Sequence, residues 1–274
     1  MKYRMIVSDY GETIVHTNSE INPLNIDAIR EYQKKGGVFA LATGREWPSI
    51  KQKISRPSFD AVEDFPIICC YGAIVITSRT EKVLFSQPLD NYLVVKILSI
   101  LDRYQYSYSV VTCDNTYVKS SIDLSNYPWK KYGNQIVVND LDEVIEIINM
   151  KHLNVYKIDV YQVENVGKLN NLLNEDGLSN LKYFANSSGL VEYVDTKAGK
   201  GSSFSLLVDY YSLHLNEVVV LGDAPNDIEL FSNAKNKLAV NNAIESLKEV
   251  SSSIIDNTDY LGLYRIIRQI LDVL

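Results

Sequence analysis

The stretch MIVSDYGET, residues 5–13, decides the fold. Its apolar run Met5-Ile6-Val7 lies within a predicted strand over residues 3–8, and such a run is typical of a strand buried in a parallel sheet. Asp9 follows where this strand is expected to end. Ligands bind open parallel sheets beyond the carboxyl ends of their strands. The stretch therefore predicts an α/β fold with Asp9 at a binding cleft.

Strands and helices alternate outward from this stretch. Asn22-Pro23 predicts a helix start, because asparagine caps helices and proline suits their first position, and Gly36-Gly37 predicts its end. Further strands are predicted over residues 38–42, 66–75 and 217–221, and further helices over 47–55, 200–211 and 228–233. This alternation predicts a doubly wound parallel sheet.

The middle of the chain has a different pattern. Apolar residues alternate over residues 104–111 and 154–160, between helical patterns over 91–104, 141–150 and 165–174. The pattern predicts an α+β insertion built on an antiparallel sheet. We therefore assign residues 1–81 and 187–274 to a core domain and residues 82–186 to an inserted domain.

Three tyrosines stand at alternate positions in residues 104–108, which read YQYSY. On a predicted strand this spacing places all three on one face. Such a face can stack on a sugar or a base, or it can pack against neighbouring strands. We favour the packing interpretation.

Composition and charge exclude several classes of protein. The 274 residues are 46% hydrophobic and 22% charged, as in ordinary globular proteins. A net charge of -7 without long basic runs argues against nucleic-acid binding. The absence of a long apolar stretch argues against a membrane span or a secretion signal, so we expect a cytoplasmic protein. The three cysteines, two of them adjacent at Cys69-Cys70, form no disulfide or zinc pattern.

Three more short motifs join Asp9. They are Thr43-Gly44-Arg45, Lys200-Gly201 and GDAPND at residues 222–227. Any one of them alone is common, since a Thr-Gly or an Asp after a strand is usually a turn or a helix cap. Together they follow two predicted strands and open one predicted helix, which would gather two carboxylates, a hydroxyl and a lysine in one cleft.

In order and spacing, the four motifs resemble those of the haloacid dehalogenase (HAD) superfamily. The long insertion resembles the α+β, C2-type cap of its Cof-type sugar-phosphatase branch. The resemblance implies a Rossmann-like HAD core and a Mg²⁺-dependent phosphatase for a small phosphorylated metabolite, with a sugar phosphate as the expected substrate. In this reaction a carboxylate attacks phosphorus, and water then hydrolyses the aspartyl-phosphate. The oligomeric state stays open.

The resemblance also implies residue roles. Asp9 is the nucleophile, while Lys200 neutralises charge on the phosphoryl group. The implied phosphoryl-binding residues are Thr43, Gly44, Lys200 and Asn226. The implied Mg²⁺ ligands are the carboxylates of Asp9, Asp223 and Asp227 and the main-chain carbonyl of Gly11.

The first motif departs from the family pattern. The family has Asp-x-Asp-Gly-Thr, whereas this chain has DYGET, so that Gly11 replaces the second aspartate. In the family that aspartate protonates the leaving group and activates water, a contribution of ~10²- to 10⁴-fold. Glu12 is the nearest replacement and a candidate catalytic residue. An extended backbone would point Glu12 away from the site, so this role requires a rearranged loop, which a glycine at position 11 permits.

Tyr71, in Cys70-Tyr71-Gly72-Ala73, is a second departure, because many family members have asparagine at this position. We favour a packing role, although a contact with substrate is the alternative.

Other functions remain as alternatives. A catalytically impaired relative would keep the phosphate cradle to bind a phosphorylated ligand or a protein partner. Loss of the water-activating residue could instead leave a stable aspartyl-phosphate on Asp9. A dehydrogenase is disfavoured because no Gly-x-Gly-x-x-Gly follows the first strand, and a receiver domain would have no inserted cap.

Overall fold

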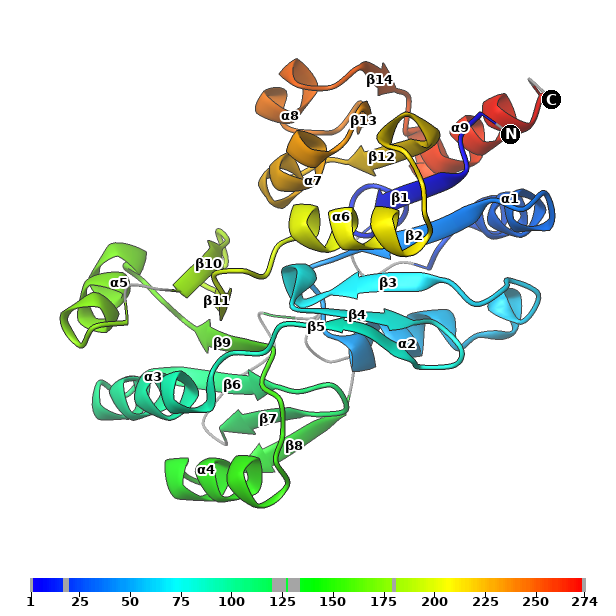
Figure 1. Cartoon of the computed structure of the whole chain (residues 1–274). Coiled ribbons are helices and arrows are strands. Elements are labelled where there is room, and N and C mark those ends of the chain that lie inside the picture. The colour runs from blue at the N-terminus through cyan, green and yellow to red at the C-terminus, as the bar shows by residue number, and fades with distance from the viewer. Residues whose placement is uncertain (1, 17–19, 120–126, 128–133, 179–180, 273–274) are drawn as a thin grey trace. The chain divides into compact units, whose positions relative to one another are not determined.

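A computed structural model describes residues 2–16, 20–119, 127, 134–178 and 181–272 (Figure 1). The chain forms two compact units. The first, here called the core unit, comprises Met1–Arg45, Lys53–Ser86 and Gly199–Leu274. The second, called the cap unit, comprises Glu46–Gln52 and Gln87–Ala198. Among the described residues, no helix combines the length and the apolarity that a membrane span requires.

The core unit is built on an eight-stranded sheet within the described residues. In spatial order its strands are β14 (Ser253–Ile255), β13 (Asn236–Val240), β12 (Val218–Gly222), β1 (Met5–Asp9), β2 (Val38–Ala42), β3 (Pro66–Cys69), β4 (Ile74–Thr77) and β5 (Val83–Ser86). Neighbours from β14 to β3 run parallel, whereas β4 and β5 pair antiparallel. The predicted doubly wound parallel core is confirmed.

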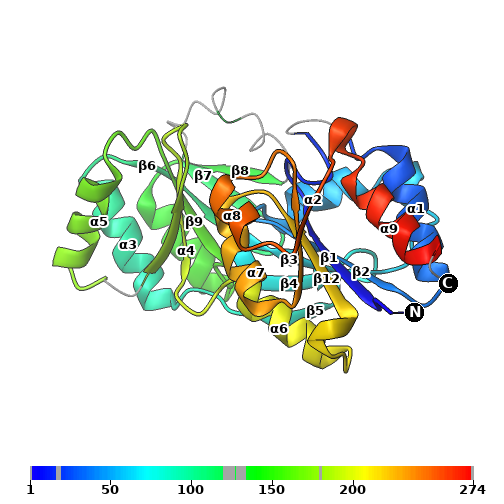
Figure 2. The ribbon, with the colours of Figure 1, turned by 90° about the horizontal axis from the view of Figure 1, so that it is seen from above.

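Helices cover both faces of this sheet (Figure 2). The helices of the core unit are α1 (Pro23–Lys34), α6 (Lys200–Tyr210), α7 (Ile228–Asn233), α8 (Glu245–Glu249) and α9 (Gly262–Asp272). Most of α2 (Trp47–Ile54) belongs to the cap-unit segment Glu46–Gln52. Met5 and Val7 of β1 pack with Phe204 of α6 on one face, while α1 and α9 lie together on the other. The predicted cap of α1 is present, since the Asn22 side chain accepts a hydrogen bond from the main-chain N–H of Leu24.

The cap unit has a second sheet with helices packed against it. Its strand order is β10 (Leu181–Ala185), β11 (Val191–Asp195), β9 (Lys157–Tyr161), β6 (Ser107–Val111), β7 (Thr116–Lys119) and β8 (Gln135–Val138). Its helices are α3 (Asn91–Arg103), α4 (Leu141–Met150) and α5 (Val166–Glu175). Most neighbouring strands are antiparallel, and β7 pairs parallel with β8. This is the α+β architecture that the insertion predicts.

Ion pairs tie the start of α2 to the cap unit. Lys157 of β9 is fully buried, and its Nζ lies 2.6 Å from Glu192 Oε1 and 3.6 Å from Glu46 Oε2. Trp47 and Ile50 of α2 are also buried. The first turns of α2 therefore belong to the cap unit, although the chain has not yet reached the main insertion.

The boundaries of the units differ from those expected from the sequence. The strand β5 pairs with β4 in the core sheet, and β11 pairs with β9 and β10 in the cap sheet. The chain therefore passes from the core unit to the cap unit after Ser86 and returns after Ala198, rather than after residues 81 and 186. Neither β5 nor β11 was among the predicted strands, and a local pattern does not identify the sheet that a strand joins.

Two local predictions are wrong. Residues 66–75 form two antiparallel strands, β3 and β4, joined by a tight turn rather than one strand. The three tyrosines of residues 104–108 share no strand face, because Tyr104 caps α3, Gln105 turns the chain at φ 60°, and β6 begins only at Ser107. Tyr108 is buried in the hydrophobic core of the cap unit. The packing interpretation therefore holds for Tyr108.

Candidate active site

Asp9 is the last residue of β1, and its side chain is almost fully buried. The parallel register aligns Asp9 with Ala42, the last residue of β2, so that Thr43 follows at the same edge of the sheet. The strand β12 lies on the other side of β1 and ends at Gly222, just before Asp223. Three of the predicted motifs therefore converge where the parallel strands end.

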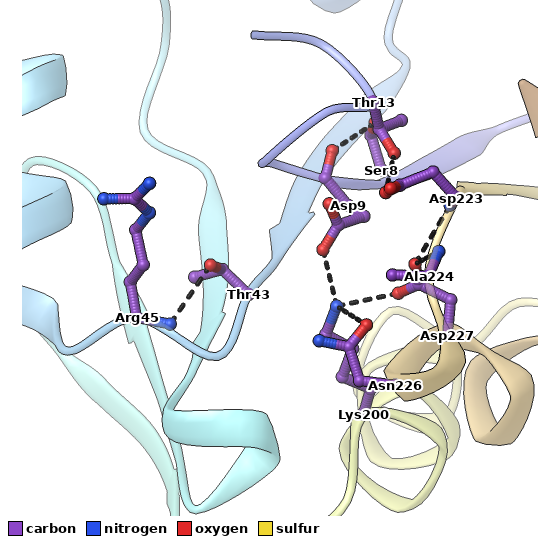
Figure 3. Close-up of polar contacts among 10 residues, drawn as sticks. All are labelled: Ser8, Asp9, Thr13, Thr43, Arg45, Lys200, Asp223, Ala224, Asn226 and Asp227. Carbon is purple, nitrogen blue, oxygen red and sulfur yellow. Dashed lines mark hydrogen bonds and ion pairs between the residues drawn. The ribbon is translucent and has the colours of Figure 1, made fainter. Parts of the chain in front are cut away.

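Lys200 begins α6 and places its ammonium group among the acidic residues (Figure 3). Its Nζ donates hydrogen bonds to Asp9 Oδ1 at 2.5 Å and Asp227 Oδ1 at 2.7 Å. A longer contact of 3.3 Å joins it to Asn226 Oδ1. The side chain is only 1% exposed, and a buried ammonium requires such partners. The structure thus brings together four of the residues predicted from the sequence.

Asp227 shapes the loop that carries Asp223. Its Oδ2 accepts hydrogen bonds from the main-chain N–H groups of Asp223 and Ala224, each at 3.1 Å. Asp223 Oδ1 in turn accepts a hydrogen bond from Thr13 Oγ1 at 2.8 Å. This bond links the last motif to the first, and the role of Thr13 in it was not identified from the sequence.

The three carboxylates form a possible cation site. One oxygen each from Asp9, Asp223 and Asp227 lies within 4.8 Å of the others. Carboxylate oxygens are hard ligands, and Mg²⁺ is usually held by one or two of them together with substrate and water oxygens. Both oxygens of Asp227 already accept hydrogen bonds, which leaves Asp9 and Asp223 as the better-placed ligands. The donor set fits Mg²⁺.

Burial and charge shift the acidities in this cluster. The net effect of the surroundings is to raise the pKa of Asp9 well above its ordinary value. Burial is the largest cause, and the positive charge of Lys200 opposes it. Burial, together with the negative charge of Asp227, raises the pKa of Asp223 to about 6. Burial alone would lower the pKa of Lys200, but Asp227 and Asp9 raise it above its ordinary value. The lysine therefore stays charged and offsets part of the negative charge.

The raised pKa of Asp223 predicts a pH-dependent stability of the metal-free protein. The unfolded chain loses this proton near pH ~3.9, and the folded chain loses it at about 6. Ionisation of Asp223 therefore lowers the free energy of unfolding as the pH rises through this window. Asp223→Asn should escape this loss, so its Tm relative to wild type should rise between pH 4 and about 6. Calorimetry with a chelator tests this, and a Tm difference independent of pH would contradict it.

Thr43 and Gly44 lie on the loop after β2. The N–H of Thr43 donates to Ile68 O at 2.8 Å, and Thr43 Oγ1 accepts from the N–H of Arg45 at 3.2 Å. Figure 3 shows this loop apart from the group around Lys200. No hydrogen bond within the described residues joins Thr43 to Asp9 or Lys200. In the predicted arrangement, a bound phosphoryl group would lie between Thr43 and Lys200 and contact both.

The loop after β1 is turned rather than extended. Glu12 has a φ of 57°, in the left-handed region that favours glycine, whereas Gly11 lies outside this region. The N–H of Glu12 donates to Val15 O at 2.7 Å, and its carbonyl accepts from Asn242 Nδ2 at 2.8 Å. Asn257 Nδ2 holds the Thr13 carbonyl at 2.9 Å. Position 12 is the glycine of the family pattern, so Glu12 occupies a strained position that its neighbours maintain.

The Glu12 side chain has a defined partner. Tyr260 donates its hydroxyl to Glu12 Oε2 at 2.7 Å. Burial and this hydrogen bond raise the pKa of Tyr260 to about 12, so the hydroxyl remains a donor at neutral pH. Burial is the largest cause of the raised pKa of Asp223, and the negative charge of Glu12 adds to it. Tyr260 belongs to no motif, and nothing in the sequence around it indicates this contact.

Comparisons with known proteins agree with this geometry. A family model described as haloacid dehalogenase-like hydrolase matches residues 6–267. The phosphatase YwtE of Bacillus subtilis, which acts on 5-amino-6-(5-phospho-D-ribitylamino)uracil, is 31% identical over 98% of each chain.

Solved structures show the same fold. A haloacid dehalogenase-like hydrolase from Bacteroides thetaiotaomicron superposes with a TM-score of 0.85 at 20% identity, covering 98% of this chain and 100% of that chain. A sugar phosphatase of HAD subclass IIB superposes with a TM-score of 0.78 at 17% identity, covering 97% and 98%. The predicted Cof-type relationship and the predicted phosphoric monoester hydrolase are both confirmed. The chain therefore belongs to the haloacid dehalogenase-like hydrolase family.

Proposed function

We propose that this protein is a Mg²⁺-dependent phosphatase that hydrolyses a small phosphorylated metabolite, a sugar phosphate, through an aspartyl-phosphate on Asp9. The observation that carries the proposal is the placement of Lys200 between the carboxylates of Asp9 and Asp227, at the edge of the sheet where Asp223 also lies. The fold shared with a sugar phosphatase supports the choice of substrate class. The relative YwtE supports a phosphorylated small molecule.

In the first step, an oxygen of Asp9 attacks phosphorus and the substrate's alkoxide leaves. The Lys200 ammonium neutralises negative charge on the phosphoryl oxygens, and the Thr43 hydroxyl and the Gly44 N–H donate hydrogen bonds to them. Mg²⁺ bound by Asp9, Asp223 and the Gly11 carbonyl would reduce the repulsion between the two anions. Asn226 and Asp227 orient Lys200.

Glu12 supplies the proton in this proposal. Its carboxyl group protonates the leaving alkoxide, and the resulting carboxylate accepts a proton from the water that attacks the aspartyl-phosphate. The products are inorganic phosphate and a regenerated Asp9. The turned loop and the hydrogen bond from Tyr260 support this role, because they hold a carboxyl group on the loop whose Thr13 contacts Asp223, despite the loss of the family aspartate.

Phosphate release from a panel of sugar phosphates and an aryl phosphate, with Mg²⁺ and with a chelator, tests the proposal. Release is expected with Mg²⁺ and should fall to background with the chelator. Equal release under both conditions would contradict the metal requirement. A protein that releases no phosphate but binds phosphorylated ligands would be the impaired relative, and stoichiometric labelling of Asp9 without turnover would indicate a stable aspartyl-phosphate.

A further inference from the structure

The turn between β3 and β4 has an unusual backbone. Three consecutive residues, Cys70, Tyr71 and Gly72, have φ angles of 48°, 55° and 98°. Glycine adopts this region freely, but a bulky side chain such as tyrosine rarely does. Such conformations persist only where the surroundings enforce them, and they cluster at functional sites. The segments that this turn contacts therefore indicate its role.

On one side, the turn contacts the loop of Thr43 and Gly44, the proposed phosphoryl-binding residues. The N–H of Tyr71 donates to Thr43 O at 3.1 Å, and the N–H of Cys70 donates to Arg45 O at 2.9 Å. These two carbonyls flank Gly44. The Tyr71 ring is buried and covers the α-carbon of Gly44 so closely that an added methyl group there would lie 2.3 Å from Tyr71 Cζ. The main chain and the ring thus hold the same loop.

On the other side, the turn packs against the start of α6. A methyl group added to Gly72 would lie 2.1 Å from the carbonyl oxygen of Gly199, the residue before Lys200. The Gly72 carbonyl also accepts a hydrogen bond from Ser203 Oγ at 2.8 Å. One turn therefore contacts both the loop that carries Gly44 and the helix that carries Lys200.

We propose that Tyr71 is a positioning residue for the phosphoryl group, and this inference rests on the proposed function. Its ring fills the space beside Gly44 and fixes the direction of the Gly44 N–H relative to the Lys200 ammonium. Donors that bind a developing charge act well only when they are held within about 0.5 Å of the productive geometry. Tyr71 provides this constraint through its contact with Gly44.

Two substitutions separate the ring from the backbone. Tyr71→Asn removes the ring but supplies a residue that tolerates the left-handed conformation, whereas Tyr71→Phe keeps the ring and removes the hydroxyl. The affinity for inorganic phosphate in the presence of Mg²⁺ should be at least about tenfold weaker in Tyr71→Asn than in the wild type. Titration calorimetry, at a temperature where both proteins are folded, measures this affinity. The kcat/KM of Tyr71→Asn for an aryl phosphate should fall on the order of 10²-fold. Tyr71→Phe keeps the ring beside Gly44 and should retain most of the phosphate affinity and kcat/KM that Tyr71→Asn loses.

A folded Tyr71→Asn variant with wild-type phosphate affinity would refute the role of Tyr71 alone. A wild type that neither binds nor hydrolyses phosphate compounds would overturn the proposed function and this inference together. If Tyr71→Asn does not fold, Gly44→Ala provides the test, because the added methyl group must displace the ring. Gly44→Ala should weaken phosphate binding, and wild-type affinity in that variant would refute the inference.

Discussion

Asp9→Asn is expected to reduce phosphate release to background, by roughly 10⁵-fold or more, the scale on which loss of a catalytic nucleophile acts. Asparagine matches the shape of aspartate but has no anionic oxygen to attack phosphorus. The fold should survive, since Lys200 keeps its hydrogen bond to Asp227 when Asp9 is neutral. The measurement is release from the best substrate of the panel, with the Tm of each protein recorded beside it.

Asp27→Asn is a suitable control for this experiment. Asp27 lies on the exposed surface of α1, where it pairs with Arg30, and it has no contact with the site. This variant makes the same chemical change and should retain full activity. Phosphate release by Asp9→Asn at the wild-type rate would refute the aspartyl-phosphate mechanism for any substrate.

Glu12→Gln should lower kcat by ~10²- to 10⁴-fold, the usual contribution of a general acid and base. Glutamine can still accept the hydrogen bond from Tyr260, so the loop should keep its conformation. Adding Gly11→Asp to this variant should restore activity. A Cβ built on Gly11 meets no heavy atom within 4 Å apart from its chain neighbours, and the φ of Gly11 lies outside the left-handed region, so the backbone at this position accepts a side chain.

Gly11→Ala in the same Glu12→Gln background is the control, because it adds a Cβ without a carboxyl group. It should restore nothing. Full activity in Glu12→Gln alone would show that Glu12 supplies no proton. If Gly11→Ala restored activity as well as Gly11→Asp does, the rescue would come from a change in loop conformation and not from the added carboxyl group.

Much of the core could be predicted from the sequence because local signals agree with the fold there. The apolar runs give β1, β2 and β12 to within about two residues, and Asn22-Pro23 identifies the start of α1. The convergence of Asp9, Asp223 and Lys200 follows from their places at strand ends and a helix start, through the topology of parallel sheets.

The remaining features depend on contacts between distant segments. The contact of Glu12 with Tyr260 joins residues separated by 248 positions, and no local pattern encodes it. The turn over Cys70–Gly72 interrupts an apolar run in which Gly72 is the one turn-favouring residue after Pro66, and a single glycine also occurs within strands. The position of β11 in the cap sheet depends on which partner strand is available, and this is decided only by tertiary packing.

Residues 46–52 belong to the cap unit although they precede the main insertion, and this restricts how the cap can be exchanged with that of a relative. A chimaera that replaces only residues 87–198 would keep the buried Glu46 but remove Lys157, its ion-pair partner. Stranding one member of a buried ion pair costs about 3–5 kcal/mol. Functional transplantation of a cap therefore requires residues 46–52 to travel with it, so the unit of inheritance is discontinuous in sequence.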